Sequence, residues 1–87
     1  MQNNPILCVD DDPINLSLLR NTLQKDYKLV FARSGAEALT AAIKHNPSLI
    51  LLDVQMPTMN GFEVARKLKS DPKTVSIPVI FVTALFD

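Results

Sequence analysis

Acidic residues follow two apolar segments of this chain, and they are the side chains whose type and spacing suit chemistry. Asp10 and Asp11 come directly after the apolar run 6–9, and Asp53 follows the apolar run 49–52. The carboxyl ends of parallel strands share one edge of an open α/β sheet, so these carboxylates are expected to converge there. Clustered carboxylates repel one another, and either a proton or a bound cation relieves the repulsion. Hard oxygen ligands with room for water favour Mg²⁺, which is the cofactor we expect.

Each of these residues also has a plain structural alternative. The alternative for Asp10, Asp11 and Asp12 is a solvated loop with a helix cap. We prefer it for Asp12 alone, because Pro13 behind it suits the first position of a helix. Asp53 would otherwise cap the loop that follows it, but an acid that ends so apolar a strand, opposite two others, favours a site. A carboxylate oxygen beside a divalent cation can attack phosphorus and form an acyl phosphate. Thr83, at the end of the last apolar run, would then bond a phosphoryl oxygen; its alternative is an ordinary turn residue.

Four short apolar runs are predicted to be strands. They span residues 6–9, 27–32, 49–52 and 79–82. Each is rich in β-branched or aromatic residues and is flanked by Pro, Asp or Ser. Their nearly continuous apolar character indicates burial on both faces, which is typical of a parallel sheet covered by helices.

Helical patterns fill the three intervals between these runs. The first helix begins at Pro13, the second follows Ser34 and Glu37, which have the spacing of a capping box, and the third covers about 61–70. The stripes expected to face the sheet are Ile14, Leu18, Leu19 and Leu23 on the first helix, Ala38, Leu39, Ala42 and Ile43 on the second, and Phe62, Ala65 and Leu68 on the third. The order βαβαβαβ with right-handed crossovers predicts a doubly wound parallel α/β sheet.

The composition fits one small globular domain and argues against several classes of protein. Hydrophobic residues make up 47% and charged residues 21% of the 87, which is typical of a folded chain. Nine basic residues balance nine acidic ones, so we expect no nucleic-acid binding. We see neither a membrane span nor a signal peptide, which predicts a cytoplasmic protein without membrane contact. The single cysteine, Cys8, cannot form an internal disulfide and is interpreted as a buried strand residue.

At these positions the chain resembles the receiver domains of bacterial two-component response regulators. The residues that carry the resemblance are Val9, Asp10 and Asp11, then Leu52 and Asp53 with MPTMNG at 56–61, and Thr83 with Ala84. They occur in the order and at the spacing of that family over essentially the whole chain. The resemblance implies a flavodoxin-like strand order 2-1-3-4, to which the family adds a fifth strand.

The same resemblance implies a role for each matching residue. The phosphorylation site is Asp53, the Mg²⁺ ligands are Asp10, Asp11, Asp53 and the backbone carbonyl of Gln55, and the phosphoryl contacts are Thr83 and the Ala84 N–H. The implied donor is the phosphohistidine of a sensor histidine kinase or a phosphotransfer protein. The domain is then regulatory rather than an enzyme, with at most self-phosphorylation and self-dephosphorylation.

The sequence departs from the family after the fourth strand. We interpret residues 1–87 as a receiver domain truncated at its C-terminus, with the fifth strand and the last two helices missing. The fifth-strand lysine and the switch aromatic residue are missing with them, so phosphorylation by a small donor is expected to be slow or absent and switching to be impaired. Strand 79–83 then becomes an open apolar edge, and we predict self-association through this edge or the uncovered face, most simply as a two-fold dimer.

Two other functions stay open at this point. Phosphatases of the haloacid dehalogenase type also use an Asp nucleophile after a strand, but they need a second acid two residues later, where this chain has Gln55. A structural or interaction domain that keeps the receiver fold without being phosphorylated is the other alternative. Phosphate uptake from acetyl phosphate, with and without Mg²⁺, separates the three functions.

Overall fold

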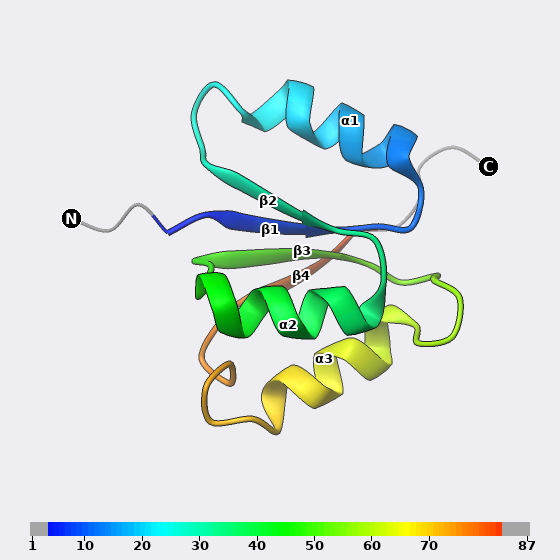
Figure 1. Cartoon of the computed structure of the whole chain (residues 1–87), viewed down its shortest axis with the longest axis vertical. Coiled ribbons are helices and arrows are strands. Elements are labelled where there is room, and N and C mark those ends of the chain that lie inside the picture. The colour runs from blue at the N-terminus through cyan, green and yellow to red at the C-terminus, as the bar shows by residue number, and fades with distance from the viewer. Residues whose placement is uncertain (1–3, 83–87) are drawn as a thin grey trace.

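The computed structural model describes residues 4–82, in which strands and helices alternate (Figure 1). The elements are β1 (Ile6–Val9), α1 (Pro13–Leu23), β2 (Leu29–Ala32), α2 (Gly35–His45), β3 (Leu49–Asp53), α3 (Gly61–Lys69) and β4 (Val79–Val82). All strand pairs are parallel, in the order β2-β1-β3-β4. The predicted doubly wound, flavodoxin-like sheet is therefore confirmed. No helix within the described residues has both the length and the apolar character needed to cross a membrane.

The helices cover the two faces of the sheet unequally. Helix α1 lies on one face, and α2 and α3 lie on the other (Figure 1). The larger core forms on the side of α2 and α3 from Leu7, Val9, Ala32, Ala38, Ala42, Ile50, Leu52, Met56, Val64, Leu68 and Ile77. A smaller core forms under α1 from Ile6, Cys8 and Leu16. The prediction that Cys8 is a buried strand residue is confirmed.

Two strand boundaries differ from the prediction. The second strand begins at Leu29 rather than at Tyr27. The Tyr27 N–H donates to the Leu23 carbonyl at 3.0 Å, so Tyr27 closes the end of α1 instead of entering the sheet. The third strand extends one residue further than predicted and includes Asp53.

Polar side chains fix the starts of α2 and α3. Ser34 accepts the Glu37 N–H at 3.1 Å, as the predicted capping box requires. The Glu37 carboxylate, however, accepts the N–H of Arg33 at 2.9 Å rather than that of Ser34, so the return bond is displaced by one residue. A complete capping box occurs instead on α3, where Asn60 and Glu63 each accept the other's N–H at 3.0 Å.

The apolar stripe predicted for α1 is wrong in part. Leu16 is buried and Leu19 packs beside it, whereas Ile14 and Leu18 are exposed. The pair Leu16 and Leu19 and the pair Ile14 and Leu18 both have helical spacing, but only one pair can face the sheet. On α2 the prediction holds for Ala38 and Ala42, which are buried, and for Leu39, which packs against the core, whereas Ile43 is exposed.

The face predicted for α3 is wrong at Phe62 and omits Val64, whereas Leu68 is buried and Ala65 packs against the core as predicted. Val64 and Leu68 are buried, while Phe62 is 55% exposed. Gly61 lies against the backbone of Asp53, and this contact fixes the rotation of the helix about its axis. That rotation turns Val64 and Leu68 inward and leaves Phe62 at the rim.

Strand β4 lacks the burial on both faces that its sequence predicted. Ile80 is 51% exposed and Phe81 is 40% exposed, and alternation along a strand places them on opposite faces. The Phe81 ring packs on Phe62 of α3 with ring centroids 5.0 Å apart. On the face of α1, Leu49 and Leu51 of the neighbouring strand are only half-buried. The apolar surface of the sheet is therefore open toward β4.

Candidate functional site

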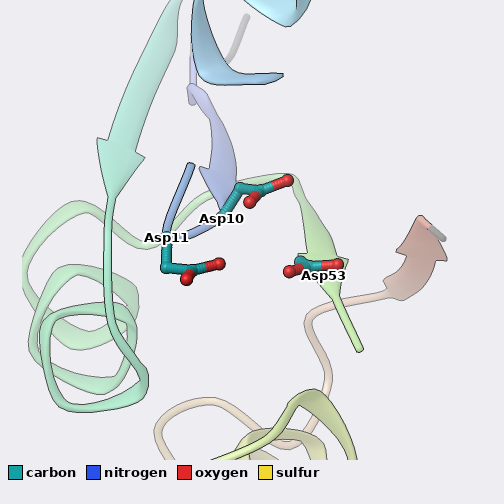
Figure 2. A group of neighbouring side chains, drawn as sticks. All are labelled: Asp10, Asp11 and Asp53. Atoms are coloured by element: carbon teal, nitrogen blue, oxygen red, sulfur yellow. The ribbon is translucent and has the colours of Figure 1, made fainter. Parts of the chain in front are cut away.

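Three carboxylates gather at the carboxyl edge of the sheet, as Figure 2 shows for Asp10, Asp11 and Asp53. Asp53 ends β3, and Asp10 and Asp11 follow directly on the neighbouring strand β1. One oxygen from each carboxylate lies within 4.8 Å of the other two. Asp10 and Asp53 are buried, and Asp11 is half-buried. The structure therefore brings together the three acids that the sequence singled out.

Protein donors hold both oxygens of the Asp10 carboxylate. The backbone N–H of Asp12 donates to Oδ1 at 3.0 Å, and the Asn15 side-chain amide donates to Oδ2 at 3.1 Å. These two bonds fix the orientation of the carboxylate while leaving lone pairs free. Asn15 was not identified from the sequence; its only signal there is an amide residue in the first helical turn after the acids.

Asp12 has the role of a helix cap. Its Oδ1 accepts the Ile14 N–H at 2.9 Å at the start of α1. It is exposed and does not belong to the group of three close carboxylates. The prediction that Asp12 caps a helix, and does not join Asp10 and Asp11 in the site, is therefore confirmed.

The electrostatics of the cluster act mainly on Asp53. Burial raises the pKa of the Asp53 carboxyl above its ordinary value, and the negative charges of Asp10 and Asp11 raise this pKa further. The backbone N–H groups of Gln55 and Val54 act in the opposite direction, because they stabilise the ionised form. The pKa of Asp53 is therefore raised first by burial and then by the two neighbouring negative charges. A hard cation would offset these negative charges.

The segment after Asp53 folds back tightly onto the end of β3. The Gly61 N–H donates to the Val54 carbonyl at 2.8 Å. A Cβ at position 61 would collide with the backbone carbonyl of Asp53, so only glycine permits this approach. Within the segment, Thr58 has a φ of 71°, and the Met59 N–H donates across it to the Pro57 carbonyl at 2.7 Å. This turn and contact hold the backbone that carries the Asp53 side chain.

Of the remaining predicted site residues, the structure describes only Gln55. Gln55 lies two residues beyond Asp53 and is exposed. Thr83 and Ala84 lie outside the described residues, so their roles stay predictions. Val82, the last residue of β4, pairs in register with Asp53, which brings the described end of that strand alongside the acid.

One basic residue near the site was also missed by sequence reasoning. Arg33 follows β2, and its Nη2 donates to the backbone carbonyl of Asp11 at 3.3 Å. The contact joins the loop after β2 to the loop after β1. No local sequence pattern indicates it, because it depends on the pairing of β1 with β2.

Comparison of the sequence with known proteins identifies a family. Residues 6–87 match the family model described as the response regulator receiver domain. The chain is 49% identical over 81 residues to the response regulator PleD of Caulobacter vibrioides. That alignment covers 92% of this chain and 18% of PleD.

Solved structures give the same result for the fold. The N-terminal domain of a response regulator receiver protein from Methanoculleus marisnigri superposes with a TM-score of 0.88 at 40% identity, covering 91% of this chain and 65% of that one. The response regulator protein TrrA from Thermotoga maritima, solved in complex with Mg²⁺-BeF, superposes with a TM-score of 0.81 at 36% identity, covering 93% of this chain and 70% of that one. The strand order described above is shared with receiver domains.

Proposed function

This chain belongs to the response regulator receiver domains, and from that premise we propose that it is a phosphoacceptor module of two-component signalling in which Asp53 takes up a phosphoryl group. The observation that supports this role is the convergence of three carboxylate oxygens, from Asp10, Asp11 and Asp53, within 4.8 Å of one another. In this proposal the module is regulatory, catalyses at most its own phosphorylation and dephosphorylation, and works in the cytoplasm.

The residues of the cluster suit Mg²⁺ as the cofactor. Three carboxylates offer hard oxygen donors, and the charges of Asp10 and Asp11 add to burial in raising the pKa of Asp53. We assign the metal to Asp10, Asp11, Asp53 and the backbone carbonyl of Gln55. When bound, Mg²⁺ neutralises part of the charge on the acids and on an incoming phosphoryl group. The Mg²⁺-BeF complex of TrrA supports this choice of ion.

Asp53 supplies the nucleophile of the proposed transfer. An ionised Asp53 oxygen forms a bond to phosphorus, the bond from phosphorus to the donor's imidazole nitrogen breaks, and its electron pair stays on that nitrogen. The contact of Gly61 with the Asp53 backbone holds the carboxylate in place for this step. Thr83 and the Ala84 N–H are assigned to the phosphoryl oxygens. The donor is a sensor histidine kinase or a phosphotransfer protein.

Uptake of phosphate from acetyl phosphate tests this function. Intact mass should show one added phosphoryl group in the presence of Mg²⁺ and none with a chelator. Asp53→Asn should abolish the addition, whereas Asp26→Asn, at an exposed acid beyond the end of α1, should leave it unchanged. Equal labelling of wild type and Asp53→Asn contradicts the assignment of the phosphoacceptor. A folded wild type that is never labelled favours the interaction domain without phosphorylation.

The apolar surface at β4 favours a second candidate function, that of an interaction domain, and indicates that the domain would bind another copy of the chain. Within residues 4–82, β4 pairs only with β3, and Ile80 and Phe81 are exposed. An apolar strand edge without charge readily pairs with another chain. We therefore propose that the chain self-associates through this edge or the open face beside α1, most simply as a two-fold dimer.

Sedimentation at micromolar concentration tests this association. Wild type should sediment as a dimer, and Ile80→Lys, which places a charge on the open face, should shift it toward monomer. Lys28→Ala, at an exposed residue before the opposite edge strand, is the matched control and should not change the sedimentation. A compact wild-type monomer with a cooperative melt would refute self-association.

A further inference from the structure

Arg33 stands directly beside the loop that carries two of the clustered acids. Strands β1 and β2 are paired with Val9 opposite Ala32, so Arg33 leaves β2 at the level where Asp10 leaves β1. The Asp10 N–H donates to the Ala32 carbonyl at 3.1 Å, which extends the pairing to this level. The position of Arg33 at the rim of the site therefore follows from the register of the sheet.

Two bonds attach Arg33 to its surroundings. Its backbone N–H donates to the Glu37 carboxylate at 2.9 Å, which ties its main chain to the first turn of α2. Its Nη2 donates to the Asp11 carbonyl at 3.3 Å. A guanidinium carries five N–H donors, and this bond to Asp11 uses only one of them. The guanidinium is always charged, whatever bonds it makes.

On the basis of the proposed phosphoacceptor function, we propose that Arg33 is a positioning residue that holds the Asp11 main chain and places a permanent positive charge at the rim of the site, where it attracts the anionic phosphoryl donor. The same charge opposes the entry of Mg²⁺ into the acidic cluster. The two effects have opposite signs because the two ligands have opposite charges. A purely structural role for Arg33 has no such signature, since a displaced Asp11 would weaken the binding of both ligands.

Two variants and one control separate these roles. Arg33→Gln removes the charge and keeps a side-chain donor, and Arg33→Lys keeps the charge and loses the planar fork. Lys44→Gln removes an equal charge in the last turn of α2, at the far end of that helix from Arg33. Two quantities are measured for each chain: the affinity for Mg²⁺ alone, and the affinity for beryllofluoride at saturating Mg²⁺, both by NMR titration. Circular dichroism establishes that each variant is folded.

The charge role predicts a split between the two affinities. Arg33→Gln should bind Mg²⁺ about two- to five-fold more tightly and beryllofluoride more weakly by a similar factor, the size typical of exposed charge pairs. Arg33→Lys and Lys44→Gln should remain near wild type for both ligands. The split should shrink in high salt, because salt screens exposed charges.

Several results overturn the assignment. If Arg33→Gln equals wild type for both ligands, or weakens both together, Arg33 has no electrostatic role. If Arg33→Gln does not fold, two other measurements decide. The electrostatic role is refuted if the affinity of wild type for beryllofluoride is insensitive to salt and Arg33→Lys loses that affinity. If wild type binds both ligands and Arg33→Gln shows no split, the role of Arg33 alone is overturned and the proposed function stands. A folded wild type that binds neither ligand overturns the proposed function and this inference together.

Discussion

Replacing Gly61 by alanine should destabilise the fold and disturb the site at the same time. The added Cβ would collide with the Asp53 carbonyl oxygen and lie 2.9 Å from the Val54 Cα. Both are backbone atoms at the end of a strand, so neither can rotate away as a side chain would. Overpacking of this kind costs about 1–3 kcal/mol. If α3 moves away, the 2.8 Å bond from the Gly61 N–H to the Val54 carbonyl is also lost, which adds about 1 kcal/mol.

The expected total of about 2–4 kcal/mol is large for a chain of this size. Typical domains are stabilised by about 0.05–0.15 kcal/mol per residue, or roughly 4–13 kcal/mol here. Urea unfolding should therefore show a midpoint well below that of wild type. Because the backbone of Asp53 must shift, Mg²⁺ affinity should fall in the fraction that remains folded.

Gly35→Ala provides the matched control, since Gly35 holds the same first position in α2 that Gly61 holds in α3. Its new Cβ would meet the Met59 sulfur at 2.8 Å, at the far end of a flexible side chain, and the Met59 Cβ and Val64 Cγ2 at 3.0 Å, with no backbone atom among them. The loss should be about 1 kcal/mol, partly offset by the reduced freedom of the unfolded chain. Equal losses in the two variants, or a Gly61→Ala chain as stable as wild type, would refute the argument from the Asp53 contact.

Three further perturbations have defined outcomes. Asn15→Ala removes one of the two donors that orient Asp10, so Mg²⁺ affinity measured by calorimetry should fall by roughly two- to tenfold; an unchanged affinity would contradict the positioning role. Asp53→Asn should raise Tm at neutral pH without Mg²⁺, by about 4–8 °C for each kcal/mol of repulsion relieved. Because the pKa of Asp53 is higher in the folded than in the unfolded state, the stability of wild type falls as pH rises between these two pKa values. The Tm gain of Asp53→Asn over wild type should therefore disappear toward about pH 4. A Tm gain that stays constant with pH would point to another cause. Burial raises the pKa of the Cys8 thiol to about 11, so at about pH 8 a disulfide reagent should react with it at least about a hundredfold more slowly in the native chain than in urea; comparable rates would mean that β1 opens readily.

The sequence predicted the strands and the acidic cluster because both depend on strong and local patterns. Four nearly continuous apolar runs have few alternatives to buried parallel strands, and an acid that follows such a run must lie at the carboxyl edge. Asp10, Asp11 and Asp53 could be placed together on that basis alone. The roles of Thr83 and Ala84 stay predictions, since the described residues end at Val82.

The rotation of the helices could not be predicted in the same way. On α3, Phe62 and Val64 both have helical spacing to Leu68 or Ala65, and the contact between Gly61 and Asp53 turns Val64 rather than Phe62 toward the sheet. Asn15 and Arg33 were missed for a related reason. Their partners, a carboxylate and a carbonyl in the loop after β1, are specified by the folded geometry rather than by any local pattern.

The central place of β1 in the sheet also constrains how the chain folds. Ile6 pairs with Leu29 on one side and with Leu49 on the other, so the strand nearest the N-terminus has no partner close to it in sequence. Every pairing in the sheet requires closure of a long loop, which slows folding compared with a helical bundle. During synthesis the apolar residues 6–9 leave the ribosome before the other strands of this sheet and remain without their second partner until β3 has emerged. The element that places Asp10 and Asp11 is therefore the one that stays exposed longest before the fold closes.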